Sequence, residues 1–463
     1  MRTPPVAVPV LGPLAMAAGL LATAATLRCA ARDRPAATQP STTEDAHVEI
    51  RVKLRTHESA HILTAAPAVF THLPCDVPAD DARRRWHRLS VPASTVDTVL
   101  AELRRDPEVA KAFATPRFTL ATTEVVERDD ESCPITTPSF ESYQGYLGPA
   151  PAGIDAPAAW RRGHRGAGVW FADVEGGWNR THEDLPGDRI EMAPGGRPVP
   201  DRSWEAHGTA VLGEVVGRDN GKGVVGIAPD VERVFTSSLL REDGGVDVAD
   251  AIDTAANKLR PGDVLLIELQ SGGPRTRYIP VEYWDDVFDA IKAATDRGVV
   301  VIEAAGNGYE DLDHPDYEGA FDRDVRDSGA IMIGAGAPAR AGYDDRAKLD
   351  FSNYGARVDV QGWGRKVATL DYGDLQACDD EHARYKDRDY TDEFSGTSSA
   401  SPIVAGAAII LQGIAKQLYD RPLPPAQLRR LLRETGTPQT GDTTRQIGPR
   451  PDLARAIDAL PKP

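Results

Sequence analysis

From residue 168 onward, the hydrophobic residues of this chain form short continuous runs separated by amphipathic segments. Five runs are predicted to be strands, namely residues 168–174, 231–240, 264–269, 299–305 and 330–335. Their almost uniformly apolar composition is typical of parallel strands buried on both faces. Residues 246–259 and 281–297 mix apolar and charged residues and favour helices between these strands. The pattern predicts an α/β fold, with a parallel β-sheet flanked by helices.

A different pattern precedes this region. Residues 47–54 alternate polar and apolar side chains, as a half-buried strand does, and residues 86–91 favour a second strand. Residues 94–105 begin with a capping serine and place their apolar side chains on one helix face. Residues 109–120 favour further strand. We therefore predict a small α+β domain over residues 47–121.

The stretch between these two regions, residues 122–150, has closely spaced acidic residues followed by prolines and glycines. Such a composition predicts an exposed connection, and self-processing of the chain is expected there. Residues 151–463 then form the predicted larger domain. Within it, the many charged residues of 371–392 favour a solvated loop.

The first 28 residues are predicted to be an export signal. Arg2 is followed by an uncharged stretch whose apolar run, from Leu14 to Ala25, contains the small-residue site Ala22-Thr23-Ala24. Residues 29–46 are polar and rich in proline and threonine, so a flexible linker is predicted. We expect a secreted or extracytoplasmic protein. A retained membrane anchor is the alternative, although four early prolines weaken a spanning helix.

Composition narrows the possible functions. The 463 residues carry a formal net charge of −17, which argues against nucleic acid as a partner because phosphate binding needs a basic surface. There are four cysteines, Cys29, Cys75, Cys133 and Cys378, and none forms a Cys-x-x-Cys pair. If the signal is removed before Cys29, the chain can form one disulfide and keep one free thiol, and the pairing stays open.

Four stretches carry residues suited to nucleophilic catalysis or to its support. Ser398 begins a long apolar helix after a small-residue turn, where free backbone N–H groups can stabilise a developing anion. Earlier in the chain, a predicted apolar strand ends on Asp173, and His207 lies at the predicted start of a helix. Asp, then His, then Ser is one of the known chain orders of a catalytic triad. Asn307 follows a buried strand and can donate its amide to an oxyanion.

In chain order, the stretches of Asp173, His207, Asn307 and Ser398 resemble those of the subtilisin-like serine proteases (subtilases). The resemblance covers roughly residues 160–460. The resemblance implies a serine endopeptidase that hydrolyses peptide bonds through an acyl-enzyme. It implies that Ser398 attacks the carbonyl carbon and that His207 accepts and then returns the proton. It also implies that Asp173 orients the imidazole and that Asn307 completes the oxyanion hole.

A substrate-binding edge is predicted where a strand runs into a pair of glycines, because an extended peptide can add to such an edge. The residues of this edge are Gln270, Ser271, Gly272 and Gly273. The resemblance implies that a second stretch helps to line the pocket for the residue before the scissile bond. That stretch consists of Ala304, Ala305 and Gly306. A plain exit from strand to turn is the alternative.

Residues 47–121 are similar in order to subtilase propeptides, which implies a zymogen whose N-terminal segment is inhibitory and is later removed. A permanent accessory domain is the alternative. The expected partners are protein or peptide substrates and the chain's own propeptide, and we expect a monomer. No metal or other cofactor is expected. The acidic residues of 310–324 leave calcium open, although they lack EF-hand spacing.

Several positions depart from the subtilase pattern. Asp173 is followed by Val174-Glu175-Gly176-Gly177, where the family has a hydroxyl residue and glycine, and Ala210 stands where a second histidine is common. Two rival classes remain: a non-catalytic peptide-binding protein of the same fold, and an esterase or lipase. The second expects Gly-x-Ser-x-Gly and a later histidine, whereas Ala400 lies two residues after Ser398 and no histidine follows.

Overall fold

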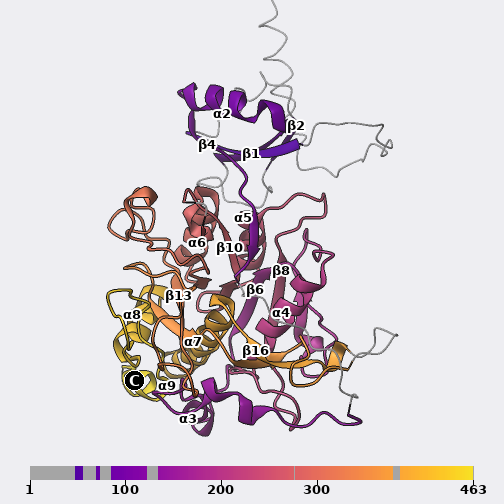
Figure 1. Ribbon diagram of the computed structural model, residues 1–463, viewed down its shortest axis with the longest axis vertical. Coiled ribbons are helices and arrows are strands. Elements are labelled where there is room, and N and C mark those ends of the chain that lie inside the picture. The colour runs from indigo at the N-terminus through magenta and orange to yellow at the C-terminus, as the bar shows by residue number, and fades with distance from the viewer. Residues whose placement is uncertain are drawn as a thin grey trace, which may run out of the picture. The chain divides into compact units, whose positions relative to one another are not determined.

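The computed structural model describes residues 47–55, 69–72, 85–121, 134–275, 277–378 and 386–461. The chain divides into two compact units, Met1–Ala114 and Thr115–Pro463 (Figure 1). The predicted export signal and linker, residues 1–46, lie outside the described residues.

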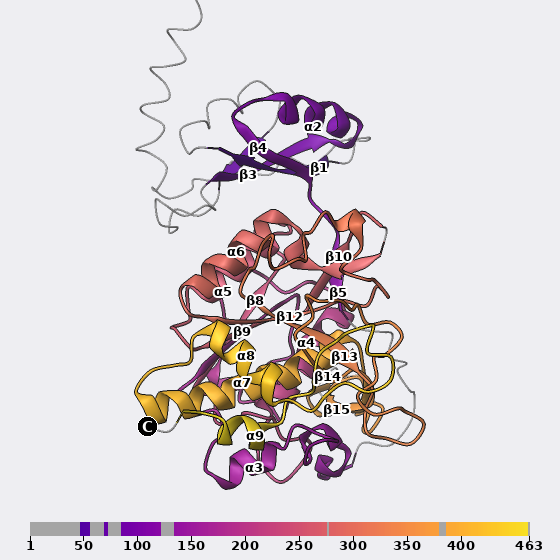
Figure 2. The same ribbon diagram turned by 90° about the vertical axis from the view of Figure 1, so that its left-hand side faces the viewer.

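The smaller unit contains an antiparallel sheet with the strand order β2-β3-β1-β4. Its strands are β1 (His47–Leu54), β2 (Val69–His72), β3 (Trp86–Pro92) and β4 (Val109–Ala114). Figure 2 shows helix α2 (Val96–Arg105) against one face of this sheet. Leu100 of α2 shares a buried apolar cluster with Ile50, Val52 and Leu54 of β1. The alternation along β1 therefore places its apolar side chains under the helix.

The larger unit is built on a parallel sheet of seven strands, in the order β14-β13-β12-β9-β6-β8-β7. The strands are β6 (Trp170–Glu175), β7 (Ile190–Met192), β8 (Arg233–Ser238), β9 (Val264–Ile267), β12 (Val300–Ala304), β13 (Ile331–Gly336) and β14 (Val360–Trp363). The five predicted apolar runs fall on β6, β8, β9, β12 and β13, and the predicted α/β fold is confirmed.

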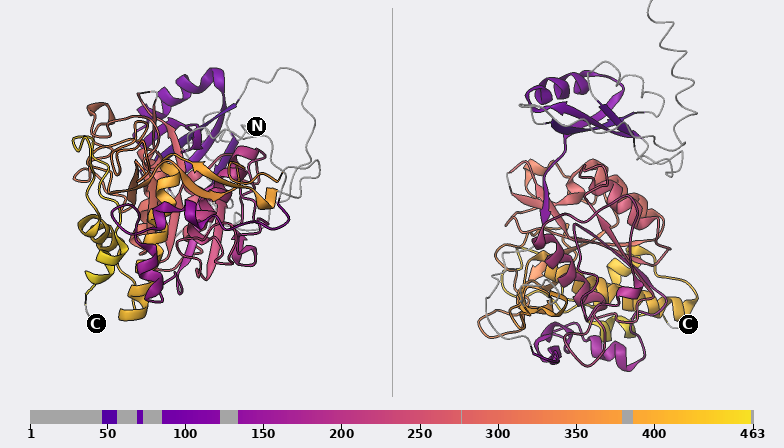
Figure 3. Two further views of the ribbon diagram at one scale, coloured as in Figure 1. Left: turned by 60° about the horizontal axis from the view of Figure 1, so that its bottom comes forward. Right: turned by 90° about the vertical axis from the view of Figure 1, so that its right-hand side faces the viewer.

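Helices cover both faces of this sheet (Figures 2 and 3). One group contains α5 (Val248–Ala256) and α6 (Asp285–Asp296), and the other contains α4 (Arg202–Val216) and α7 (Thr397–Tyr419). Side chains of β6 alternate between two apolar clusters: Phe171 belongs to the α4 and α7 cluster, whereas Ala172 and Val174 belong to the α5 cluster. The other α-helices in the described part of this unit are α3 (Ala156–Arg161), α8 (Pro425–Thr435) and α9 (Leu453–Asp458).

Helix α7 forms the centre of the larger core. Among the described residues it is the one helix long and apolar enough to span a membrane, yet 94% of its most apolar window is buried inside the protein. Burial of this kind is typical of a core helix.

Two small antiparallel sheets complete the larger unit. One has the order β11-β10-β5, with β5 (Phe118–Leu120), β10 (Leu269–Gly272) and β11 (Tyr278–Pro280). The other pairs β15 (Val367–Leu370) with β16 (Tyr390–Phe394). Strand β5 is the last described part of the segment predicted to be propeptide, and it belongs to the larger unit.

The exposed connection predicted over residues 122–150 is only partly correct for residues 134–150, where exposed residues are interspersed with buried ones. Tyr146 is fully buried and Leu147 is nearly so, and both belong to the main core cluster. The Tyr146 hydroxyl also donates a hydrogen bond of 3.0 Å to the carbonyl of Ala368. These residues are part of the larger unit because they supply apolar side chains to its core. Residues 122–133 lie outside the described residues.

The charged stretch 371–392 is only partly the predicted loop. Asp371 is buried and pairs with Arg202 of α4, and Tyr390 is a fully buried core residue of β16. Cys378 is disulfide-bonded, and the other three cysteines lie outside the described residues.

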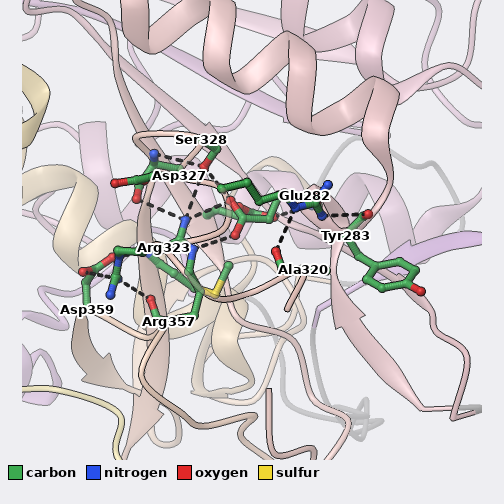
Figure 4. Close-up of polar contacts among 12 residues, drawn as sticks. Glu282, Tyr283, Ala320, Arg323, Asp327, Ser328, Arg357 and Asp359 are labelled. Carbon is green, nitrogen blue, oxygen red and sulfur yellow. Dashed lines mark hydrogen bonds and ion pairs between the residues drawn. The ribbon is translucent and has the colours of Figure 1, made fainter. Parts of the chain in front are cut away.

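A buried ionic network lies next to β14 in the larger unit (Figure 4). Arg357 is almost fully buried and donates to both carboxyl oxygens of Glu282, at 2.6 and 2.8 Å. It also donates to Asp359 at 3.0 Å. Arg323 donates to the other oxygen of Asp359 at 2.5 Å, and Ser328 donates to Glu282 at 2.5 Å. We call these five residues the Arg357 network.

Candidate active site

Ser398 is the second residue of α7 and is fully buried. Gly396, at the helix N-cap, has a φ of 107°, which a side chain would oppose, so the turn into the helix requires glycine. The Ser398 backbone N–H is among the helix-start donors that have no intrahelical acceptor. It donates a hydrogen bond of 3.0 Å to the carbonyl of Ala121. The Ser398 hydroxyl oxygen has no hydrogen-bond partner among the described residues.

His207 lies on α4, which begins at Asp201 with a side-chain cap to the Ser203 N–H at 2.8 Å. Its ring is fully buried and packs edge-on against Phe394, with 5.4 Å between the ring centroids. The Nδ1 atom lies 2.6 Å from Oε2 of Glu175, and Nε2 is buried without a partner among the described residues. Burial lowers the pKa of His207 to about 3, so the imidazole is neutral near pH 7.

The contact predicted between Asp173 and the imidazole is wrong, because Glu175 occupies that position. Asp173 is also fully buried, but its Oδ2 accepts a hydrogen bond of 2.6 Å from Nε1 of Trp178. Strand β6 continues for two residues beyond Asp173 and ends on Glu175, directly before Gly176. The departure from the family pattern after Asp173 was the available signal, since a carboxylate followed by glycine occurs at Glu175.

Asn307 is held so that its amide nitrogen remains available. Its Oδ1 accepts hydrogen bonds of 3.0 Å from both the N–H and the hydroxyl of Thr397. Its own backbone N–H donates to Oε1 of Gln270 at 2.8 Å. The Nδ2 atom is buried without a partner among the described residues. Such a donor can stabilise an oxyanion that forms only in the tetrahedral intermediate.

The predicted substrate-binding edge is occupied by a segment of the same chain. Strand β5 lies antiparallel to β10, with Leu120 opposite Leu269, Thr119 opposite Gln270 and Phe118 opposite Ser271.

Gln270 forms hydrogen bonds with both strand β5 and Asn307. Its Nε2 donates to the carbonyl of Leu120 at 2.6 Å, while its Oε1 accepts from Asn307. Gly272 is the exposed last residue of β10, and Gly273 donates from its N–H to the carbonyl of Arg277 in the following turn.

The second predicted lining stretch lies at the carboxyl end of β12. Ala304 and Ala305 are fully buried, and Gly306 has a φ of 88°. The Gly306 N–H donates to the hydroxyl of Thr397 at 3.2 Å. A Cβ atom on Gly306 would lie 2.9 Å from the side-chain nitrogen of Asn353. This stretch therefore sits beside the start of α7 with no room for larger side chains at Gly306.

Further buried carboxyl groups surround the site. Glu214 of α4 and Glu268, between β9 and β10, are fully buried, and neither has a hydrogen-bond partner for its side-chain oxygens among the described residues. Burial raises the pKa of both groups well above the ordinary glutamate value. The Ser398 hydroxyl is close enough to Glu268 to favour its charged form slightly, although the two do not meet hydrogen-bond geometry. Sequence analysis did not identify either residue.

Three of the acidic residues of 310–324 contact other groups of the protein. Arg275 pairs with Glu310 at 2.8 Å and with Asp316 at 3.0 Å, and Asp313 accepts from the N–H of Ala356. No group of three or more potential ligand side chains is arranged around a common point within the described ranges.

Comparisons with known proteins agree with this fold. The model of the subtilase family matches residues 181–448, which include His207, Asn307 and Ser398 and begin after β6. An intracellular serine protease of Paenibacillus polymyxa is 29% identical over 287 residues, covering 59% of this chain and 76% of the relative. Subtilisin BL of Lederbergia lenta is 28% identical over 264 residues, covering 56% and 81%.

The fold also matches a solved structure. Fervidolysin from Fervidobacterium pennivorans, a keratinolytic enzyme related to subtilisin, aligns with a TM-score of 0.61 at 20% identity. The alignment covers 92% of this chain and 63% of that chain. The family match spans more than half of the sequence, so the chain belongs to the subtilase family. Within that family it is a serine endopeptidase.

Proposed function

We propose that the protein is an exported serine endopeptidase, made as a zymogen, that uses Glu175, His207 and Ser398 as its catalytic triad. One observation carries this proposal: the backbone N–H of Ser398 donates to the carbonyl of Ala121, at the end of a strand paired with β10. A peptide substrate bound by strand addition would present its scissile carbonyl in the same way. This hydrogen bond and strand pairing support the proposal that the segment ending at Ala121 is bound as a substrate would be.

The chemistry follows from the groups around this carbonyl. Oγ of Ser398 attacks the carbonyl carbon, and Nε2 of His207, which is neutral and unpaired, accepts the hydroxyl proton. Glu175 stabilises the resulting imidazolium through Nδ1. The developing oxyanion receives hydrogen bonds from the Ser398 N–H and the Asn307 amide. His207 then protonates the leaving amine, and water hydrolyses the acyl-enzyme. The proposed reaction needs no cofactor.

The register of β5 against β10 supports one bond as the site of self-processing. Ala121 supplies the carbonyl, so cleavage would separate Ala121 from Thr122. Phe118, Thr119 and Leu120 would then occupy the preceding substrate positions. Phe118 is buried in the same apolar cluster as Leu269. We therefore propose a preference for an alanine directly before the cut bond and an apolar side chain three residues earlier.

The proposals of export and of an inhibitory propeptide rest on the sequence before Ala121. Residues 1–28 have the composition of an export signal, and residues 47–121 would be the released propeptide. The mature enzyme is proposed to act as a monomer on proteins or peptides. Expression with and without residues 1–28, followed by cell fractionation, tests the export step, because only the longer chain should leave the cytoplasm.

Intact mass and labelling test the central proposal. Wild type, Ser398→Ala and Ser399→Ala are purified and treated with a fluorophosphonate. Wild type should begin at Thr122 and gain one adduct, whereas Ser398→Ala should stay uncut and unlabelled. Ser399→Ala is the matched control, because its hydroxyl bonds to the carbonyl of Trp363 at 3.0 Å and should not be needed. If wild type stays uncut and unlabelled across pH and calcium concentration, the proposal is wrong and a peptide-binding role replaces it.

A further inference from the structure

Two carboxyl side chains project from the same face of β6 beside His207. Asp173 and Glu175 are two residues apart in a strand, so their side chains point to the same side of the sheet. Both are fully buried. Each uses one oxygen for a defined contact: Asp173 accepts from Trp178 at 2.6 Å, and Glu175 meets His207 at 2.6 Å.

The second oxygens of this pair, Oδ1 of Asp173 and Oε1 of Glu175, have no donor among the other described residues. The two side chains leave the same face of β6, and each affects the pKa of the other through a hydrogen bond. Two neighbouring buried carboxylates disfavour each other's charge, whereas a carboxylic acid can donate one hydrogen bond to a neighbouring carboxylate. One proton between the two residues therefore satisfies both orphan oxygens.

We propose that Asp173 holds this proton and donates it in a hydrogen bond to Glu175, and so acts as a positioning residue that keeps Glu175 charged and directed at His207. The arrangement forms a chain from Trp178 through Asp173 and Glu175 to the imidazole. The proposal rests on the triad assigned above.

Neighbouring groups favour this placement of the proton. Burial raises the pKa of both carboxyl groups well above their ordinary values. The nearby charge of Glu175 raises the pKa of Asp173 further, whereas the hydrogen bond from Asp173 acts to lower the pKa of Glu175. The other titratable groups that face the pair are His207 on α4 and Glu268 after β9, and Glu214 faces Glu268.

Replacing Asp173 with asparagine tests whether Asp173 is a neutral hydrogen-bond donor or a second negative charge beside Glu175. The asparagine amide can donate to Glu175 while its oxygen accepts from Trp178, so Asp173→Asn should keep kcat/KM within about fivefold of wild type. Asp173→Ala removes the donor to a charged group and should lower kcat/KM about 10- to 100-fold. A chromogenic peptide with Phe-Thr-Leu-Ala before the cut bond, the sequence of Phe118 to Ala121, is the substrate.

The pH profile gives a second readout. Activity requires Glu175 charged and His207 neutral, and the donor from Asp173 lowers the pKa of Glu175. Asp173→Ala should therefore move the acidic limb of kcat/KM to higher pH, while Asp173→Asn should leave it in place. If Asp173 were charged, Asp173→Asn would remove a charge that stabilises the imidazolium and would move the acidic limb to lower pH. That shift, or equal losses in the two variants, would overturn the proposal.

Infrared difference spectroscopy on inactive full-length protein locates the proton without any turnover. At neutral pH, Ser398→Ala should show the carbonyl stretch of a protonated carboxylic acid that is lost on adding Asp173→Asn and retained on adding Glu175→Gln. A carbonyl stretch that is lost with Glu175→Gln and retained with Asp173→Asn would place the proton on Glu175 and contradict the proposal. If the expected pattern appears in a protein that never cleaves peptides, the proposed function fails while the proton assignment stands.

Discussion

The region around the active-site face of β6 and the Arg357 network both contain buried carboxyl groups, but these groups differ in their hydrogen-bond partners. In the Arg357 network, Glu282 and Asp359 each receive hydrogen bonds from arginine. Burial alone would raise the pKa of Glu282, yet Arg357 outweighs it and the net pKa is lowered. Around the active site, Glu214 and Glu268 have no hydrogen-bond donor among the described residues, and burial raises their pKa values.

This difference separates a stabilising site from a reactive one. A buried ion pair with all its hydrogen bonds made is costly to disrupt, because removing one partner leaves an uncompensated charge. Unpaired buried polar atoms cost folding free energy, and they concentrate where atoms must remain available for a substrate or a proton. The unpaired atoms at this site include Oγ of Ser398, Nε2 of His207 and Nδ2 of Asn307. The comparison leads to four experiments.

The largest expected effect comes from removing the charge next to the imidazole. Glu175→Gln in the mature enzyme should lower kcat about 10⁴-fold, because the imidazolium loses its carboxylate and the wrong tautomer is favoured. Glu191→Gln is the control, since Glu191 is an exposed residue of β7 that pairs only at the surface with Lys258. Steady-state kinetics on the Phe-Thr-Leu-Ala peptide measure both. A Glu175→Gln enzyme as active as the control would remove Glu175 from the triad.

Disrupting the Arg357 network should act on stability. Arg357→Met, made in the uncut Ser398→Ala protein, should lower the free energy of unfolding of the larger unit by about 3–5 kcal/mol, since Glu282 and Asp359 lose their buried partner. Arg365→Met breaks an exposed pair with Asp350 and should cost less than about 1 kcal/mol. Denaturant unfolding gives both values. Equal costs would show that burial does not distinguish the two pairs.

Asn307→Ala should lower kcat about 100- to 1,000-fold, because the oxyanion loses one of its two donors while the triad remains. The partner donor, the Ser398 N–H, belongs to the backbone and is retained. Fluorophosphonate labelling of the variant should still occur, although more slowly. Turnover equal to wild type would show that the Asn307 amide does not face the oxyanion.

The smallest effects concern how stability depends on pH. Burial raises the pKa of Glu214, so protonated Glu214 is compatible with the folded protein at low pH. The free energy of unfolding should therefore fall as pH rises above the ordinary glutamate pKa of about 4.3. Glu214→Gln removes that loss, so its stability relative to the parent should increase from pH 5 to pH 8.

Glu282 should show the opposite dependence. Its pKa is lowered, so it contributes stability above the ordinary glutamate pKa and loses it as pH falls through the folded value. The destabilisation by Glu282→Gln should be full above about pH 5 and should shrink toward pH 3. Urea unfolding of the two variants in the Ser398→Ala protein measures both slopes. Slopes of the same sign would contradict the contrast between the two regions.

Much of the site was predictable because it follows from local sequence. The turn before Ser398, the helix that carries His207 and the strand that leads to Asn307 each have a composition that determines one kind of element. Parallel strands place their carboxyl ends at one edge, so residues far apart in the chain were expected to meet there. Ser398 lies at the predicted start of α7, and Asn307 follows β12 as predicted. The prediction that His207 begins a helix is wrong: it is the sixth residue of α4, because Asp201 caps that helix earlier in the chain.

The triad carboxylate could not be chosen in the same way. Asp173 and Glu175 lie on the same face of one strand, and strand alternation makes both equally suitable. Only the position of α4 across the sheet decides that Nδ1 of His207 reaches Glu175. The proposed processing bond could not be predicted from the sequence for a related reason. It follows from the register of β5 against β10, and that register depends on long-range contacts.

The sequence by itself determined the α/β fold and predicted Ser398, His207 and Asn307 as the nucleophile, the base and the oxyanion donor, because periodicity and turn chemistry are local properties. Tertiary structure alone decided which carboxylate meets His207, which carbonyl meets the Ser398 N–H, and which acids are buried without a cation. Those outcomes depend on distances between separate elements and on exclusion of water, and neither is encoded in the spacing of residues along one strand or helix.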